Sequence, residues 1–410
     1  MRHRFLLGAV AIAATAVATA SAAPPKSDVR FATFNASLNR PSAGLLTTHL
    51  ESPNVDDQSR RQAKNVAEVI QRVAPDVLLI NEFDPLDNAD APVGPEELLR
   101  DNFLQVSQNG ATPIDYPYVF IAPSNTGVAT GKDLNNNGVA VTTPGAVGYG
   151  DDAFGFGAFP GQFGMVVYSK YPILHDQVRT FQLFKWKDMP GNLIPTPFYS
   201  PDEVEILRLS SKSHWDLPIL VGGKVVHFLT SHPTPPVFDG AEDRNGTRNY
   251  DEIRFWADYI SPGEAGYIYD DAGGTGGLKP GSLFVIAGDQ NSDPLDGDSI
   301  PGSIQLLLEH PLVNAKTTPE SPGAVQQNAL QGGANLGHES DPRYDTADFA
   351  DTAPGNLRAD YVLPRKTMQI VSSGVFWPLN TDPLFRLVGT FPFPTSDHRL
   401  VWVDATVPAN

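Results

Sequence analysis

The sequence of 410 residues contains no cysteine. Disulfide bonds, thiolate zinc sites and a cysteine nucleophile are therefore all excluded. Positive charge is scarce as well, with 29 Lys and Arg against 47 Asp and Glu and a formal net charge of −18. Because non-specific binding of nucleic acid depends on Lys and Arg that neutralise phosphates, this balance argues against it, although a cleft can be locally positive or filled by a metal ion.

A long hydrophobic run is also absent after the N-terminus, so we expect no membrane span. The N-terminus itself has a basic start at Arg2 and Arg4, an apolar run over residues 5–20 and small residues before two prolines. This pattern predicts a secretory signal peptide over residues 1–23. An N-terminal membrane anchor is the alternative. We expect a secreted protein that works in the periplasm or outside the cell.

What the chain does contain is typical of a globular protein rich in loops. It is 41% hydrophobic and 19% charged, with 36 Gly and 37 Pro, which excludes a disordered chain and a coiled coil. Its length would allow two or three domains of about 150 residues each, but no repeat or linker interrupts it. We therefore expect one domain over residues 24–410, with long loop insertions at about 85–160 and 182–215.

Short apolar strands alternate with helices along the chain. The segment 57–73 places Ala63, Val66 and Ile70 on one helical stripe, and a second helix is expected over 249–260. Strands are expected over 29–34, 76–80, 166–168, 225–230, 283–287, 361–363 and 400–403. The alternation predicts an α/β fold.

Five of these strands have polar residues at or next to an end: Asn35, Glu82, His232, Asp289 with Asn291, and Asp397 with His398. A single Asn or Asp at such a place has an ordinary explanation, because both residues favour turns. Five such ends, together with Asp360, are better explained by a ligand site, since strand ends of α/β folds fix side chains in space.

These segments resemble the motifs of the endonuclease/exonuclease/phosphatase superfamily, which includes deoxyribonuclease I-like nucleases, sphingomyelinases and inositol polyphosphate phosphatases. The resemblance extends from Val29 to about Val403 and is most specific in Gly-Asp-Gln-Asn at 288–291 and Ser-Asp-His at 396–398. It implies a four-layer sandwich of two packed mixed β-sheets flanked by helices. The other matching segments are 33–35, 75–82, 230–232 and 360–362.

The residues also fit the chemistry of such enzymes. Hydrolysis of a phosphate ester is slow because the anionic centre repels nucleophiles, and a hard divalent cation on oxygen ligands offsets this repulsion. Glu82 is the best candidate for a metal ligand, and the resemblance adds Asn35 and Asp397 to the metal site. Without cysteine, Mg²⁺ or Mn²⁺ fits such a site better than zinc.

The resemblance further implies acid–base and phosphate-binding roles. Asp289 would orient or deprotonate the attacking water, and Asn291 would donate to a phosphoryl oxygen. His398 would be the general base or a phosphate donor, with Asp360 fixing its tautomer. His232 would contact the phosphate or protonate the leaving group. The glutamate that accompanies this histidine in deoxyribonuclease-like enzymes cannot be placed in the sequence.

Two further clusters have alternative interpretations. Arg244 and Arg248 could bind a substrate phosphate bidentately, or they could pair with neighbouring acids. Asp133, Asn135 and Asn137 resemble the first half of a calcium loop, but the glutamate expected at its twelfth position is missing, which excludes an EF-hand. A structural Ca²⁺ site and an Asn-Gly turn both stay open.

The sequence thus predicts a secreted metal-dependent phosphoesterase, either a phosphodiesterase or a phosphatase, in which water attacks the phosphorus in line. Its substrate would be a small phosphoester, a phosphorylated head group or a nucleic acid, and no obligate protein partner is evident. An extracellular endonuclease acting on DNA or RNA is the first alternative. A catalytically silent binding module on the same fold is the second.

Overall fold

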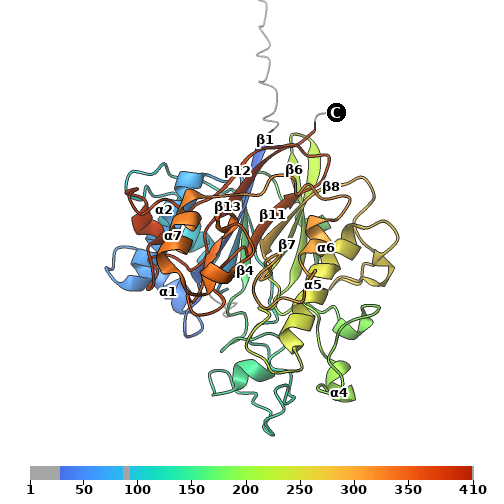
Figure 1. Cartoon of the computed structure of the whole chain (residues 1–410). Coiled ribbons are helices and arrows are strands. Elements are labelled where there is room, and N and C mark those ends of the chain that lie inside the picture. The colour runs from blue at the N-terminus through green and yellow to red at the C-terminus, as the bar shows by residue number, and fades with distance from the viewer. Residues whose placement is uncertain (1–27, 86–92, 409–410) are drawn as a thin grey trace, which may run out of the picture.

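Two β-sheets packed against each other form the centre of the protein (Figure 1). The computed structural model describes residues 28–85 and 93–408, so the signal peptide expected at 1–23 lies outside the described residues. The first sheet has six strands, in the spatial order β12 (Ile370–Val375), β13 (Val401–Thr406), β1 (Asp28–Leu38), β2 (Val77–Phe83), β4 (Met165–Ser169) and β3 (Tyr118–Phe120).

The second sheet has five strands. Their spatial order is β11 (Asp360–Pro364), β8 (Leu283–Asp289), β7 (Lys224–Ser231), β6 (His214–Val221) and β5 (Arg179–Thr180). The facing sides of the two sheets are apolar, as where the rings of Phe31 and Phe228 lie 5.8 Å apart. Both rings are fully buried, and the burial of each contributes on the order of 1.5–3 kcal/mol to stability.

Helices cover the outer face of each sheet (Figure 1). On the first sheet lies α2 (Gln58–Val73), which begins where the side chain of Asp57 accepts the backbone N–H of Arg60 at 2.9 Å. On the second lies α5 (Arg244–Ile260), whose aromatic residues share a core with β7 and β8. The shorter helices are α1 (Leu45–Glu51), α3 (Pro95–Leu99), α4 (Pro201–Val204), α6 (Gln305–Leu308), α7 (Pro322–Gln331) and α8 (Phe385–Val388).

Both sheets are mixed, and their parallel pairs set the position of the polar strand ends. β1 is parallel to β2, with Asn35 opposite Asn81, and β7 is parallel to β8. In the second sheet Asp289 is the antiparallel partner of Asp360, across β8 and β11. Because parallel strands end at the same edge of a sheet, the predicted site residues come together there.

The helices and the two sheets confirm the expected four-layer α/β sandwich. The analysis of the sequence did not predict the shorter helices and several strands. Among these, strand β6 contains Asp216 and Pro218, edge strand β12 carries the exposed Ser372, and α7 has few apolar residues. The expected loop insertions are mostly irregular, and Figure 1 shows parts of both, in teal and green with α4, extending beyond the sheets.

Within residues 28–85 and 93–408, the structure has no helix that combines the length and the apolar character needed to cross a membrane.

Candidate active site

Asn35 joins the two sheets at the centre of the site. Its side-chain amide donates to Oε1 of Glu82 and to Oδ2 of Asp289, each at 3.1 Å. Glu82 comes from the first sheet and Asp289 from the second. The fold therefore brings residues more than 200 positions apart in the sequence into direct contact, as the sequence predicted.

Glu82 is held by a second amide that the sequence analysis did not single out. The side chain of Asn39 donates to Oε2 of Glu82 at 2.8 Å. Asn39 follows an irregularity in β1, where the pairing with β2 shifts register, and no spacing rule pointed to it. Enclosure by protein, with Asp397 nearby, raises the pKa of the Glu82 carboxyl. Two amide donors contact the Glu82 carboxylate, and no Lys or Arg among the described residues forms an ion pair with it.

Asp289 lies at the end of β8, directly after Gly288. A side-chain carbon at Gly288 would come 2.0 Å from the backbone oxygen of Ser231, and its φ of 147° lies in a region that favours glycine. Glycine thus allows β8 to approach β7 closely just before the carboxylate. Burial raises the pKa of Asp289 to about 7, an effect that Asp360 strengthens and His398 opposes.

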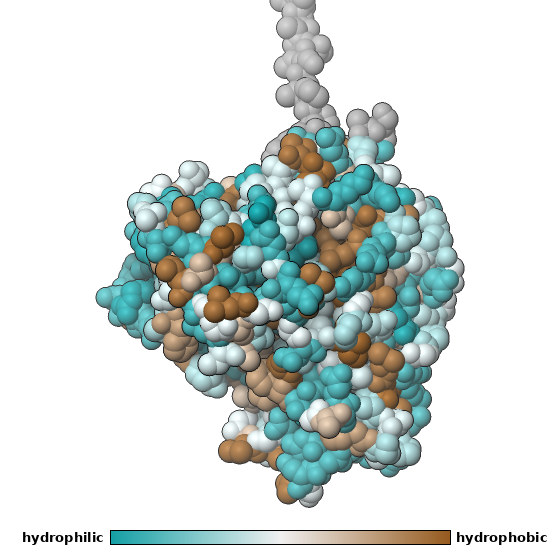
Figure 2. All heavy atoms as spheres, viewed as in Figure 1, coloured by the Kyte–Doolittle hydropathy of each residue, from teal (hydrophilic) through white to brown (hydrophobic). Residues whose placement is uncertain are grey.

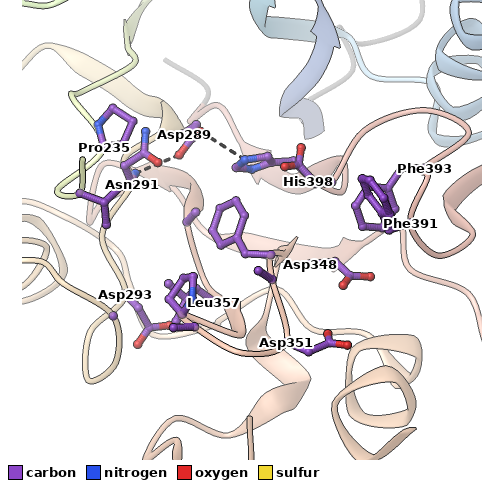
Figure 3. A pocket seen from close by; sticks show the side chains of 18 of the residues that line it. Pro235, Asp289, Asn291, Asp293, Asp348, Asp351, Leu357, Phe391, Phe393 and His398 are labelled. Carbon is purple, nitrogen blue, oxygen red and sulfur yellow. Dashed lines mark hydrogen bonds and ion pairs between the residues drawn. The ribbon is translucent and has the colours of Figure 1, made fainter. Parts of the chain in front are cut away.

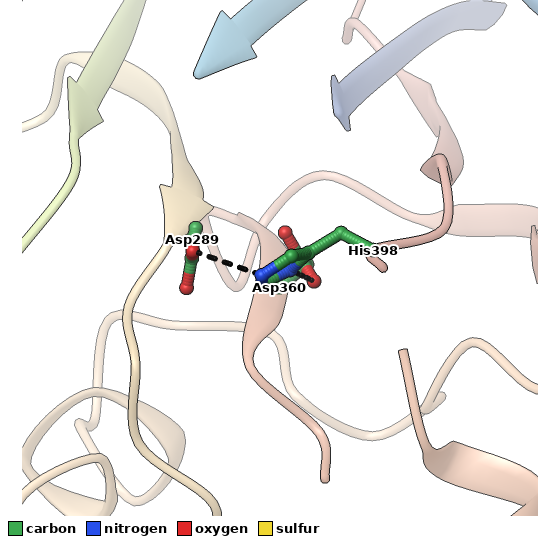
Figure 4. Close-up of side chains that lie close together, drawn as sticks. All are labelled: Asp289, Asp360 and His398. Atoms are coloured by element: carbon green, nitrogen blue, oxygen red, sulfur yellow. Dashed lines mark hydrogen bonds and ion pairs between the residues drawn. The ribbon is translucent and has the colours of Figure 1, made fainter. Parts of the chain in front are cut away.

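His398 lies between two carboxylates (Figure 4). Its Nδ1 is 2.9 Å from Oδ2 of Asp360, and its Nε2 is 3.6 Å from Oδ2 of Asp289. Thr346 also donates to Oδ2 of Asp360, at 2.8 Å, which fixes that carboxylate. Burial alone would lower the pKa of His398, but the two carboxylates outweigh burial and raise it well above the usual value. The two carboxylates therefore favour the protonated form of the ring.

The pKa of His232 is shifted in the direction opposite to that of His398. Its Nε2 is 3.4 Å from Oδ2 of Asp289, and its Nδ1 is buried without a hydrogen-bond partner among the described residues. Burial, with the charges of Lys212 and His398, lowers the pKa of His232 well below its usual value. This environment favours the neutral imidazole, and the described residues supply no glutamate on Nδ1.

Lys212 is a second residue that the sequence analysis missed. Only 6% of it is exposed, and it precedes β6, a strand that was not predicted. Burial lowers the pKa of the lysine ammonium, while Glu252, Asp289 and Glu82 act in the opposite direction. These interactions place a buried cation beside the carboxylates of the site. A single Lys in a serine-rich segment gave no signal of this position.

Asn291 lines the same cavity as the residues above. Its backbone N–H donates to Oδ1 of Asp289 at 2.9 Å, and its side-chain amide donates to the backbone oxygen of Pro233 at 3.1 Å. The amide keeps one further N–H for another acceptor. Asp397 and Glu82 line the cavity too, so it contains most of the residues that the sequence predicted.

The structure does not bring the two arginines to this cavity. Arg244 forms an ion pair with Glu242, and Arg248 donates to the backbone oxygens of Leu209, Phe154 and Arg208. The helix expected at 249–260 begins at Arg244, so both arginines are helical rather than in a loop. Their guanidinium groups are engaged within the protein, which corrects the expectation that they bind a substrate phosphate.

The predicted calcium loop is an Asx turn in this structure. Both carboxylate oxygens of Asp133 accept backbone N–H groups, from Asn137 at 3.1 Å and Gly138 at 2.7 Å. The amide oxygens of Asn135 and Asn137 accept backbone N–H groups as well. These contacts with the local backbone are those of an Asn-Gly turn.

Two separate sets of side chains could hold a metal ion. Asp289, Asp360 and His398 offer ligand atoms that lie within 4.8 Å of one another. In that set, however, Nδ1 of His398 is engaged by Asp360. Glu82 with Asn35 and Asp397 offers oxygen ligands only, and the repulsion between Glu82 and Asp397 is what a cation would relieve. The second set therefore fits a hard divalent cation better.

The chain matches one known family over most of its length. The sequence pattern of the Endonuclease/Exonuclease/phosphatase family matches residues 32–398. No curated protein matches the sequence.

Three solved structures illustrate the structural likeness. A Beutenbergia cavernae endonuclease/exonuclease/phosphatase is 18% identical, with 94% of this chain and 72% of that chain covered and a TM-score of 0.49. Sphingomyelinase C from Streptomyces griseocarneus is 14% identical, with 92% and 99% covered and a TM-score of 0.44. Truncated Caenorhabditis elegans TDP2 is 14% identical, with 94% and 100% covered and a TM-score of 0.44. Similarity at this level says nothing about the substrate.

Proposed function

The chain belongs to the endonuclease/exonuclease/phosphatase family of phosphoester-cleaving hydrolases, and on this premise we propose that it is a secreted, divalent-metal-dependent phosphoesterase. The observation that carries the proposal is the position of Asp289, which lies beside His232 and His398 in one cavity and is held from behind by Asn35. A carboxylate with two histidines beside it is an arrangement suited to proton transfer, which favours an enzyme over a catalytically silent binding module.

In the proposed reaction, Asp289 accepts a proton from the attacking water. A carboxyl whose pKa lies at about 7 is suited to this task near neutral pH, because about half of the molecules carry the deprotonated form and the accepted proton is readily released. As the water oxygen bonds to phosphorus, the ester P–O bond breaks and the alcohol oxygen leaves with the electron pair. The proton that Asp289 accepted is then released and, through solvent water, balances the charge on the leaving oxygen.

His398 would donate a hydrogen bond to the negatively charged phosphoryl group, and Lys212, which does not line the cavity, would act on it only through its buried charge. The carboxylates beside His398 favour its protonated ring, so it acts as a hydrogen-bond donor and not as the base, with Asp360 holding the ring in place. Asn291 has one amide N–H left for the same group. Removal of a single such donor typically reduces turnover by about 10²–10³-fold.

Glu82, with Asn35 and Asp397, would hold Mg²⁺ or Mn²⁺. When bound, the cation withdraws charge from the phosphoryl and leaving oxygens. Asn35 and Asn39 fix the Glu82 carboxylate from two sides, so that it can serve as a ligand without moving.

The test is hydrolysis of bis-p-nitrophenyl phosphate by the wild type, by Glu82→Gln and by the control Glu51→Gln, with and without EDTA. Glu51 is an exposed residue of α1, so its variant should match the wild type. We expect Glu82→Gln to be inactive and folded, EDTA to inactivate the wild type, and Mg²⁺ or Mn²⁺ to restore it. Full activity in excess EDTA would refute the metal mechanism.

The proposal that the protein is secreted depends only on the signal peptide predicted over residues 1–23. The N-terminal sequence of the mature protein tests it: expression with export should yield a chain that begins after Ala22 or Ala23. A mature chain that still begins with Met1 would contradict the proposal.

A further inference from the structure

A large cavity extends from the catalytic residues. Its volume is about 1240 Å³, whereas pockets for drug-sized molecules measure roughly 300–1,000 Å³. Figure 3 shows Asp289 and His398 on one side of it, Phe391 and Phe393 on another, and Leu357 opposite the catalytic pair. A phosphate group beside Asp289 would leave most of this volume for the organic part of an ester.

The wall beyond the catalytic residues is rich in apolar side chains. Phe349 follows β9 (Ala347–Asp348), and its ring packs edge-on against that of His398, with centroids 5.2 Å apart. The rings of Phe391 and Phe393 form a second edge-on pair at 6.1 Å. The apolar wall thus begins directly at the catalytic histidine and continues outward.

Two apolar residues of this wall are strongly exposed. Phe391 is 84% exposed and Leu330, near the end of α7, is 64% exposed. Figure 2 shows several hydrophobic residues, in brown, exposed over the part of the molecule where Figure 1 draws α7. Large apolar side chains gathered around a cavity are typical of a surface that binds an apolar group.

The charge of the lining restricts what that group can be. None of the described residues that line the cavity is Lys or Arg. Asp298 and Asp351 are exposed at its wall, in addition to the carboxylates of the catalytic centre. A substrate with further phosphates beside the reacting one would meet these acids without a Lys or Arg in the lining to offset them.

We propose that this cavity, which we call the ester pocket, binds an apolar organic group of the substrate. The enzyme then acts on phosphoesters that carry a bulky apolar group and no second anionic group, in preference to nucleic acids. This inference rests on the proposed phosphoesterase activity and adds the substrate class to it. Phe349, Leu330, Leu357, Phe391 and Phe393 are its specificity-determining residues.

The test uses 4-nitrophenyl phosphate diesters that differ only in their second ester group: methyl, n-octyl and thymidine 5′-yl, the last with and without an additional 3′-phosphate. The same P–O bond breaks in each, so kcat/KM compares binding of the second group alone. We expect the octyl ester, below its micellar concentration, to exceed the methyl ester at least about tenfold. The additional 3′-phosphate should lower kcat/KM of the thymidine ester.

Two pocket variants and one control variant test whether the preference for the octyl ester arises in the ester pocket. Phe391→Ser and Leu330→Ser should each lower the octyl-to-methyl ratio at least about threefold, whereas Phe156→Ser should not change it. Phe156 is 66% exposed and does not line the cavity, so it matches Phe391 in exposure but not in position. All three residues are exposed enough for their replacement to leave the core intact.

The two proposals fail in different ways. Hydrolysis of the methyl ester with a ratio near one, or a ratio that neither pocket variant lowers, overturns the ester pocket and leaves the phosphoesterase activity standing. A higher kcat/KM for the thymidine 3′-phosphate ester than for the octyl ester overturns it as well. No hydrolysis of any ester, with Mg²⁺ and Mn²⁺ present, overturns the proposed function and the inference together.

Discussion

The side-chain amide of Asn35 contacts Glu82 and Asp289 at the same distance, 3.1 Å, and is the direct link between the proposed metal ligand and the proposed base. The two N–H groups of this one amide donate to one carboxylate oxygen of Glu82 in the first sheet and one of Asp289 in the second. The relative position of the two carboxylates therefore depends on a single side chain that is itself 1% exposed.

Replacement of Asn35 by Ala should impair both catalysis and stability. Two hydrogen bonds to carboxylates are lost, each worth roughly 1.5–3 kcal/mol to a charged group, so we expect kcat to fall at least about tenfold and the melting temperature to drop. Denaturation and steady-state kinetics measure the two effects. Asn35→Asp should be worse, because it adds a third carboxylate. An Asp variant as active as the wild type would contradict the bridging role.

Replacement of Asp360 by Asn should change the pH dependence of turnover. Asp360 raises the pKa of His398, so its loss lowers that pKa. Activity that needs protonated His398 is present below this pKa and is lost as the pH rises through it. The alkaline limb of the kcat profile should therefore move to lower pH, and His398→Ala should cost more activity than Asp360→Asn at every pH. An unmoved alkaline limb would show that His398 does not act as the proton-bearing donor.

Replacement of Lys212 by Met should act on both catalysis and the histidines. The charge of Lys212 lowers the pKa of His232, so the variant should raise it, which NMR titration of the imidazole resonances can measure. Without this cation we also expect kcat/KM to fall by about 10²-fold, as for the loss of a preorganised donor. Lys279→Met, at an exposed position, is the matched control. A mere loss of stability would leave the pKa of His232 unchanged.

Asp345 makes stability depend on pH away from the catalytic residues. Burial, with Asp293, Asp296 and Asp341 nearby, raises the pKa of Asp345 from 3.8 to about 9. The folded state thus binds a proton that the unfolded chain releases, and the stability gained below pH 3.8 is lost as the pH rises toward 9.

The variant Asp345→Asn removes this dependence because its amide cannot ionise. Between pH 5 and pH 8 the variant should gain stability relative to the wild type, by at least about 1 kcal/mol and at most about 4 kcal/mol, the value for three pH units of full linkage. Urea denaturation at both pH values measures it. Equal differences between variant and wild type at pH 5 and pH 8 would show that Asp345 ionises normally in the folded state.

The sequence revealed the fold and the centre of the site because both depend on local patterns. Gly-Asp-Gln-Asn and Ser-Asp-His follow or precede short apolar strands, and strand ends converge when the strands form two packed sheets. Asn39 and Lys212 could not be predicted in this way. Asn39 reaches Glu82 through a register shift in β1, and Lys212 precedes a strand that contains a proline.

The same reasoning explains the error at the arginines. Arg244 and Arg248 stand four residues apart beside a strand that ends in His232, which suggested a phosphate site. The helix that contains them begins earlier than its apolar pattern, so their guanidinium groups meet Glu242 and backbone oxygens instead. The ester pocket could not be predicted from the sequence because the residues of its wall come from four separate segments of the chain. The Phe-Pro-Phe at 391–393 was the one local pattern that could have indicated an apolar surface.

The central claim is that Asp289 activates water in a phosphoester hydrolase, and kcat of Asp289→Asn tests it most directly. The amide keeps the size of the side chain but accepts no proton. In saturating Mg²⁺ or Mn²⁺ with bis-p-nitrophenyl phosphate, the account predicts a kcat lower by at least about 10²–10⁴-fold in a variant that stays folded. A folded Asp289→Asn protein that hydrolyses the diester at the wild-type rate would contradict it.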